Sequence, residues 1–169
     1  MKYTSAEVAK LLRLLNEKHA GIRELERKSA VFTAAIEENI EDVRPEYDYK
    51  DIQSQLAELE EKIRVVKHLI NSFNLVTTVP GYDMTVDQML VYIPQLSEKK
   101  RKLSEMACRI PRERVSSGYG KKAIVEYEYA NYNIPEVRAE LLAVTDELSR
   151  AQTALDVVNN SMSFEIDIE

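Results

Sequence analysis

The residues of this chain that are best suited to bind a ligand are basic and lie close together. Although the 169-residue chain has a net charge of −6, residues 99–122 contain nine basic side chains and two acidic ones. This segment therefore has a charge of +7, and the rest of the chain sums to −13. Such a local concentration of one sign attracts anions. The basic residues are Lys99, Lys100, Arg101, Lys102, Arg109, Arg112, Arg114, Lys121 and Lys122.

Three arginines of this segment precede a turn signal. Arg109, Arg112 and Arg114 come before Ser116-Ser-Gly-Tyr-Gly120, a sequence typical of the turn between two strands. A guanidinium group pairs with two phosphate oxygens at once, and exposed backbone N–H groups in a turn add donors. We therefore predict that a small phosphate-bearing ligand binds here, held by these three arginines and Lys122.

Two other interpretations of the basic segment stay open. The four consecutive basic residues at 99–102 also fit the solvated face of a helix. The arginines beside the turn can instead meet the acidic surface of a neighbouring subunit, with no ligand between them.

Aromatic and amide side chains gather at the ends of the expected helices and strands. Tyrosine rings stack on nucleobases and asparagine amides read base edges, which is how proteins hold nucleotides outside a duplex. The structural interpretation is that the asparagines cap helices and the tyrosines pack in a strand. The residues assigned to base binding are Tyr119, Tyr127, Tyr129, Asn71 and Asn74.

The motifs of common enzymes are missing from the sequence. It contains no glycine-rich phosphate loop with its lysine, no Cys-x-x-Cys and no His-Glu-x-x-His, and neither His19 nor His68 has a spaced metal partner. Glu126 and Glu128 share one face of an expected strand, where paired carboxylates are far more often solvated than catalytic. We predict a binding protein with no catalytic residue, no metal and no cofactor.

The elements that must position these residues are mostly helical. Apolar residues at helical spacing predict helices over 4–28, 49–74, 85–108 with a kink at Pro94, and 135–159. Thr4 with Glu7 and Thr85 with Gln88 have the spacing of capping boxes. Two apolar stripes run unbroken along the second and fourth of these helices. They consist of Ile52, Leu56, Leu59, Ile63, Val66, Ile70 and Phe73, and of Val137, Leu141, Val144, Leu148, Ala151, Leu155 and Val158.

Short extended segments complete the prediction. Alternation around the turn predicts a β-hairpin over about 110–130. A second alternating stretch predicts a strand over about 162–168, which needs the hairpin as its partner. Segment 29–43 fits either a strand, which is weakly favoured, or a helix that breaks there. The expected fold is mainly α (α+β): one domain over 1–169 of long antiparallel helical hairpins, or a coiled-coil bundle, with a small β-hairpin and a C-terminal strand.

Composition limits the compartment and the partners. No stretch approaches the roughly 20 apolar residues that cross a bilayer, so no membrane partner is expected. A single cysteine, Cys108, suits a reducing cytoplasm. The acidic net charge disfavours genomic DNA or RNA. Val65 and Leu69 form a second apolar edge beside the stripe of their helix, which predicts a homo-oligomer.

Two stretches resemble a family of bacterial and phage proteins of unknown function, sometimes labelled septicolysin-like. They are Ile70-Asn-Ser-Phe-Asn74, and Gln152-Thr-Ala-Leu-Asp156 with Asn159, followed by Phe164-Glu-Ile166. The family has an Ile-Asn-x-x-Asn signature at a helix end and a Leu-Asp-x-x-x-Asn-like signature near the C-terminus. Phe73 departs from the small polar residue expected at its position. The resemblance implies long helical hairpins with a small β element, and no established activity.

These observations lead to two hypotheses of function. The first is a homo-oligomeric binding protein that captures a phosphate-bearing small molecule such as a nucleotide signal; in a viral gene it would act like the sponge proteins with which phages absorb host immune signals, an analogy of logic only. The rival is a coiled-coil adaptor whose apolar stripes bind protein partners.

Overall fold

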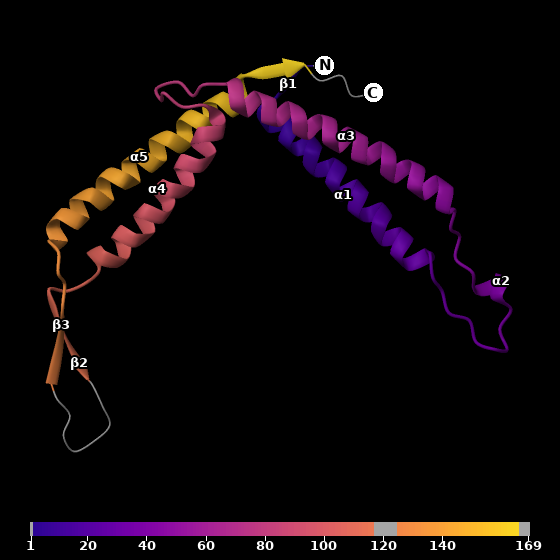
Figure 1. Cartoon of the computed structure of the whole chain (residues 1–169), viewed down its shortest axis with the longest axis horizontal. Helices are drawn as coiled ribbons and strands as arrows, with labels where there is room; N and C mark the ends of the chain where they lie inside the picture. Colours follow the sequence, from indigo (N-terminus) through magenta and orange to yellow (C-terminus); the bar gives the residue numbers. More distant parts are fainter. Residues whose placement is uncertain (1, 117–124, 166–169) are drawn as a thin grey trace. The chain divides into compact units, whose positions relative to one another are not determined.

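A computed structural model describes residues 2–116 and 125–165 of the chain (Figure 1). The helices are α1 (Ser5–Ser29), α2 (Ile40–Val43), α3 (Tyr49–Val76), α4 (Val86–Ala107) and α5 (Ile134–Ser161). The strands are β1 (Lys2–Thr4), β2 (Arg112–Ser116), β3 (Val125–Tyr129) and β4 (Ser163–Glu165). The prediction of a mainly helical chain with a small β-hairpin is confirmed.

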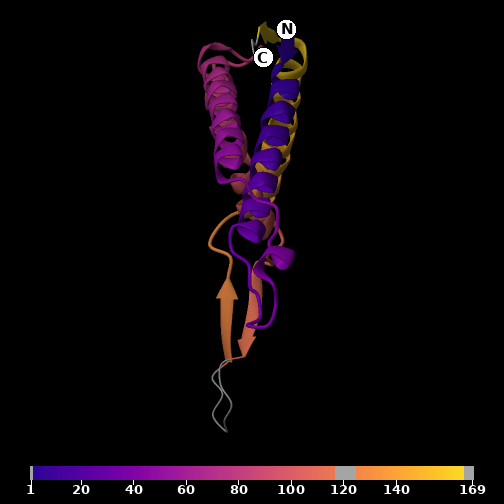
Figure 2. The same ribbon diagram turned by 90° about the vertical axis from the view of Figure 1, so that its right-hand side faces the viewer.

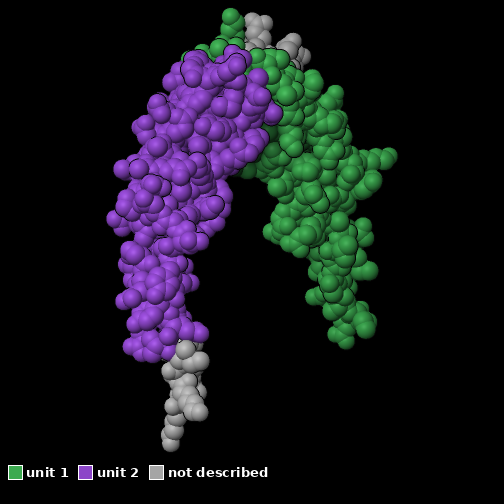
Figure 3. All heavy atoms as spheres, turned by 60° about the vertical axis from the view of Figure 1, so that its left-hand side comes forward, with its two compact units in different colours: residues 1–77, 158–169 green, residues 78–157 purple. Residues whose placement is uncertain are grey.

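The chain divides into two compact units, which Figure 3 distinguishes by colour. Unit 1 comprises Met1–Thr77 and Val158–Glu169, and unit 2 comprises Thr78–Val157. We describe each unit by itself, and the expectation of a single domain stays a prediction.

Unit 1 is built on α1 and α3, which lie side by side in both ribbon views (Figures 1 and 2). Its core holds Val8, Leu15 and Val66, and both Val8 and Val66 are completely buried. Partly buried apolar side chains from the two helices pack around these three residues. Since the buried positions of each helix recur at helical spacing, one stripe of α1 is matched to one stripe of α3.

The cap predicted at the start of α1 is present. The Thr4 side chain accepts a hydrogen bond from the Glu7 N–H at 3.3 Å, and a Glu7 carboxylate oxygen accepts one from the Thr4 N–H at 2.8 Å. These two bonds satisfy backbone donors that the first helical turn leaves without partners. The equivalent pair, Thr85 and Gln88, caps α4 in the same way.

Segment 29–43 does not form the weakly favoured strand and agrees with the alternative, a helix that breaks there. α1 ends at Ser29, an irregular stretch follows, and α2 is a single turn of four residues. Asn39 caps that turn by accepting a hydrogen bond from the Glu41 N–H. The β-forming residues around Phe32 stay outside any sheet because a strand needs a pairing edge within reach, and the 25 residues of α1 carry the chain about 38 Å away from the β1–β4 pair.

The C-terminal strand pairs with a partner that the sequence analysis did not predict. β4 lies antiparallel to β1, with Tyr3 opposite Phe164, and not beside the hairpin. The reason is the length of α5, which separates β3 from β4. Its 28 residues advance the chain by about 42 Å along the helix axis, and a strand at its end pairs with a local edge instead.

Unit 2 is built on α4 and α5, which are joined by polar contacts along their length. Lys99 Nζ lies 2.7 Å from a Glu140 carboxylate oxygen, and the Tyr92 hydroxyl donates a hydrogen bond to a Glu147 carboxylate oxygen at 3.3 Å. The α5 stripe is buried as predicted except for Leu141, which is partly buried. α4 runs continuously through Pro94, so this proline does not split the helix; the kink stays a prediction.

A turn precedes α4 at Pro80-Gly81. The Tyr82 N–H donates to the Val79 carbonyl at 3.1 Å, and Gly81 between them has a φ of 82°. A positive φ at the third position of a four-residue turn favours glycine, and proline suits the second.

Candidate functional site

The strand register decides which hairpin side chains share a face. β2 and β3 are antiparallel, with Arg112 opposite Tyr129 and Arg114 opposite Tyr127. Residues directly opposite each other project from the same face of a sheet, and alternate residues along a strand return to that face. Arg112, Arg114, Tyr127 and Tyr129 therefore project from one face of the hairpin, which we call the Arg–Tyr face.

The side chains of the Arg–Tyr face contact one another. The guanidinium carbon of Arg112 lies 4.5 Å from the centre of the Tyr127 ring. The rings of Tyr127 and Tyr129 have their centres 6.4 Å apart and are tilted by 50°. A cation over a ring is attracted by the electrons of the ring face. The N–H groups of a guanidinium lie in its plane, so those directed away from the ring stay available to an acceptor.

This face is open to solvent. Tyr127 is 42% exposed and Tyr129 is 63% exposed. Both arginines are exposed as well. An exposed pair of aromatic rings beside two guanidinium groups has the chemistry to stack a planar ring and to pair with the oxygens of an attached phosphate.

The opposite face of the hairpin is acidic. Glu113 lies directly opposite Glu128, and Val115 lies opposite Glu126. Arg109, which precedes β2, is placed on this side: its Nη1 lies 3.2 Å from a Glu128 carboxylate oxygen. The structure therefore brings Arg112 and Arg114 together, whereas Arg109 pairs with a carboxylate behind them.

A cavity of about 320 Å³ lies at the base of the hairpin, against the end of α4. It is lined by three carboxylates and one arginine, so its lining does not favour a phosphate. The lining residues are Glu105, Met106, Arg109, Ile110, Glu113, Glu128, Tyr129, Ala130 and Tyr132.

Hydrogen bonds fix the base of the hairpin to α4. The Tyr132 hydroxyl donates to the Met106 carbonyl at 3.0 Å, and Arg138 Nε donates to the Ala107 carbonyl at 3.3 Å. These carbonyls belong to the last turn of α4, and that of Met106 also accepts a hydrogen bond from the Arg109 N–H at 3.2 Å. The Tyr132 bond therefore anchors the residues that follow β3 at the end of this helix, and the Arg138 bond joins α5 to the same turn.

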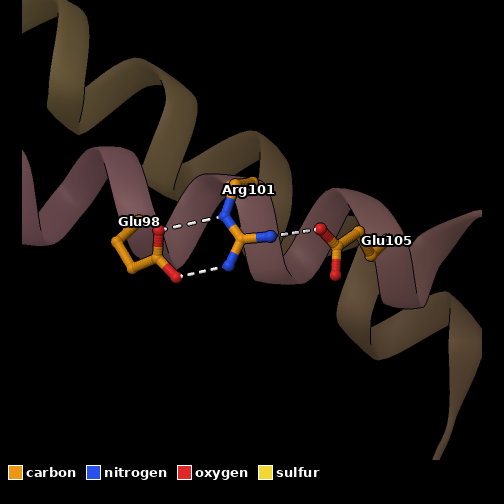
Figure 4. Close-up of polar contacts among 3 residues, drawn as sticks. All are labelled: Glu98, Arg101 and Glu105. Atoms are coloured by element: carbon orange, nitrogen blue, oxygen red, sulfur yellow. Dashed lines mark hydrogen bonds and ion pairs between the residues drawn. The ribbon is translucent and has the colours of Figure 1, made fainter.

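The helical part of the basic segment is engaged with carboxylates. Figure 4 shows the Arg101 guanidinium between Glu98 and Glu105 on α4, with the Glu98 contact at 2.6 Å. These two carboxylates raise the pKa of Arg101 above its usual value, chiefly through the Glu98 hydrogen bond. Together with the Lys99–Glu140 pair, this arrangement favours the solvated helix face as the interpretation of residues 99–102.

The remaining predicted site residues lie elsewhere. Asn71 and Asn74 are on α3 in unit 1 and therefore belong to a different unit from the hairpin. Tyr119 and Lys122 fall outside the described residues. His19, on α1, lies 3.3 Å from a Glu60 carboxylate oxygen on α3.

Two features are absent from the described residues. Residues 2–116 and 125–165 contain no group of three or more His, Cys, Asp or Glu side chains placed to hold a metal ion. Over the same ranges, no helix combines the length and the apolar character that a membrane span requires.

Sequence reasoning placed Glu126 and Glu128 on one face of a strand but did not place Glu113 on the same face of the hairpin. The alternation of Arg112 with Arg114, and of Tyr127 with Tyr129, signals that each pair shares a face. Glu113 and Val115 alternate with the two arginines along β2, so the same period of two assigns them to the opposite face of the hairpin. No sequence signal aligns the two strands, so the pairing of Arg109 with Glu128 could not be predicted.

Comparison with known proteins supports the fold alone. No family model matches the chain, and no curated protein matches it. The structure resembles the crystal structure of a functionally unknown conserved protein from Corynebacterium diphtheriae, with a TM-score of 0.65 and 18% sequence identity. The match covers 98% of this chain and 100% of that one.

Proposed function

We propose that this protein captures a small phosphate-bearing molecule with an aromatic base, such as a nucleotide signal, on the Arg–Tyr face of its hairpin, and that it does so as a homo-oligomer. The observation that carries the proposal is the register, which places two arginines and two tyrosines on one exposed face.

The chemistry of the face selects this class of ligand. Arg114 and the in-plane N–H groups of Arg112 supply donors to phosphate oxygens, and charge-assisted bonds of this kind are about twice as strong as neutral ones. Tyr127 and Tyr129 offer ring surfaces to a base, and each stacked base contributes about 1–3 kcal/mol. A long polyanion is disfavoured because the rest of the chain is acidic.

The oligomer rests on apolar side chains that each unit leaves in solvent. On α1, Leu14 is 52% exposed although Leu15 beside it is buried. On α5, Leu142 is 73% exposed. These side chains are available for contacts between copies.

The test measures the binding of a panel of nucleotides to the full chain by thermal shift and by calorimetry. We expect at least one nucleotide to raise the melting temperature by mass action. Arg114→Gln removes a charged donor and should reduce the affinity for that nucleotide by about tenfold or more, since such a bond contributes about 1.5–3 kcal/mol. Arg64→Gln, an exposed arginine on α3, is the matched control and should bind normally.

Two further measurements sharpen the test. Tyr127→Leu keeps an apolar side chain but removes the ring, so it should reduce the affinity for nucleotides more than the affinity for inorganic phosphate. Native mass spectrometry of the purified protein reports any nucleotide carried through purification. A panel without any thermal shift, together with no bound small molecule in the mass spectra, would refute the proposal.

The rival function is an adaptor that binds protein partners through its helices. Unit 1 supplies an observation in its favour: a cavity of about 440 Å³ along α1 and α3, lined by Gly21, Ile22, Leu25 and Leu59 among others. An adaptor predicts that nucleotides leave the melting temperature unchanged and that Leu25→Asp reduces capture of a protein partner.

A further inference from the structure

The segment between α1 and α3 is acidic and exposed. Residues 31–48, which we call the acidic tip, contain six carboxylates and one arginine, a charge of −5. Every one of these six side chains is exposed. The tip follows the end of α1, includes the short helix α2 and leads into α3 (Figure 1).

The acidic tip also presents apolar side chains to solvent. Val31 is 81% exposed, Ile36 is fully exposed and Ile40 is 53% exposed. Phe32 and Val43 are exposed to a smaller extent. Single apolar residues on a surface are ordinary, but five within one short segment indicate a surface that contacts another molecule.

Local bonds hold the tip in a defined conformation. The Ala35 N–H donates to a Glu38 carboxylate oxygen at 2.9 Å, and the guanidinium of Arg44 lies 5.9 Å from the centre of the Phe32 ring. The Tyr47 hydroxyl lies 3.2 Å from a carboxylate oxygen of Glu26 on α1. A surface that is already ordered loses less conformational entropy when it binds.

The same chain contains a surface of complementary character. The Arg–Tyr face has two guanidinium groups, two exposed tyrosine rings and Val125, which is 50% exposed and alternates onto the same face. Opposite charges surrounded by exposed apolar groups on both sides suit a specific contact between proteins.

We propose that the acidic tip of one copy docks against the Arg–Tyr face of a second copy. This inference rests on the proposed function in one respect, because both require that the Arg–Tyr face binds acidic groups. The contact is heterologous, since the two surfaces differ, so it builds either a closed assembly or an extending one. Carboxylates of the tip and phosphates of a ligand then compete for Arg112 and Arg114.

Charge reversal tests the contact. Arg112→Glu with Arg114→Glu places negative charge opposite the tip, and Glu37→Lys with Asp42→Lys places positive charge opposite the hairpin. Each double variant should weaken self-association, measured by sedimentation velocity at low ionic strength, by about tenfold or more. A chain with all four substitutions restores opposite charges and should associate to within about threefold of the original.

Matched controls change the same charge elsewhere. Arg64→Glu with Lys67→Glu, and Glu58→Lys with Glu61→Lys, alter exposed positions on α3 by the same net amounts. They should leave self-association unchanged, and circular dichroism should show that all variants keep their helices. A monomer at every concentration, tip variants that associate normally, or a quadruple variant that fails to recover would each overturn the proposed contact.

The outcome separates this inference from the proposed function. The Glu37→Lys and Asp42→Lys variant keeps the Arg–Tyr face intact, so it should bind a nucleotide of the panel at least as well as the original chain. If the charge swap recovers association but no nucleotide binds, the docking contact stands and nucleotide capture fails. If nucleotides bind but the charge-reversal variants associate like the original chain, nucleotide capture stands and the docking contact fails.

Discussion

Replacing Val66 by alanine tests the packing of α3 against α1 more directly than any other single change. Val66 is completely buried beside Val8 and Leu15, whereas its neighbour Val65 is 42% exposed. The two valines lie on one helix, one residue apart, so Val65→Ala is a control with the same chemistry and a different environment.

The expected magnitudes follow from burial. Two methyl groups removed from the core cost about 1.6 kcal/mol at ~0.8 kcal/mol per carbon. A residual cavity of about 40 Å³ adds about 1 kcal/mol. Alanine recovers about 0.6 kcal/mol because it favours the helix more than valine does. We expect Val66→Ala to lower the free energy of unfolding by about 2 kcal/mol. Val65→Ala should lower it by about 0.3 kcal/mol, since only part of its side chain leaves water on folding.

The assay is urea denaturation followed by far-ultraviolet circular dichroism, with amide hydrogen exchange of α3 to report on unit 1 separately. Exchange in α3 should quicken in the Val66 variant and stay nearly unchanged in the Val65 variant. Equal losses of stability in the two variants would refute the assignment of the α3 face that packs on α1.

Three other predictions concern titration and capping. The hydrogen bond from Arg27, aided by Lys28, lowers the pKa of Glu24 from 4.5 to about 2. Its stabilising effect is therefore complete above pH 4.5 and is lost as the pH falls toward about 2; in Arg27→Gln, nuclear magnetic resonance should find the Glu24 pKa closer to 4.5. Burial, with the Glu147 carboxylate next, raises the pKa of Tyr92, so Glu147→Gln should lower the midpoint of its ultraviolet titration, and an unchanged midpoint would contradict the contact. Thr85→Ala removes the cap of α4 and should cost about 1 kcal/mol in unfolding free energy, a loss that Thr85→Ser should largely avoid.

Local structure was readable from the sequence because its causes are local. The capping boxes at Thr4 and Thr85 depend on residues three positions apart, and both are present. The apolar stripes of α3 and α5 depend only on helical periodicity. Six of the seven members on α5 are buried, whereas on α3 three are buried and the other four are partly buried.

Pairing between distant segments was not readable, because it depends on which edges and faces the fold brings within reach. The alternation near the C-terminus predicted a strand, but only the structure pairs β4 with β1. The β-forming residues around Phe32 have no partner strand among the described residues, so their propensity is not realised.

The candidate site divides in the same way. The charge of residues 99–122, and the sharing of a face by Arg112 with Arg114 and by Tyr127 with Tyr129, follow from residue type and a period of two. Only the tertiary structure decides that these two pairs meet on one face, and that Arg109 turns to Glu128 on the other. The physical reason is that backbone hydrogen bonds between strands are nearly indifferent to side chains. The register therefore depends on the geometry of the connecting turn and on which face the fold buries, and neither can be read from one strand alone.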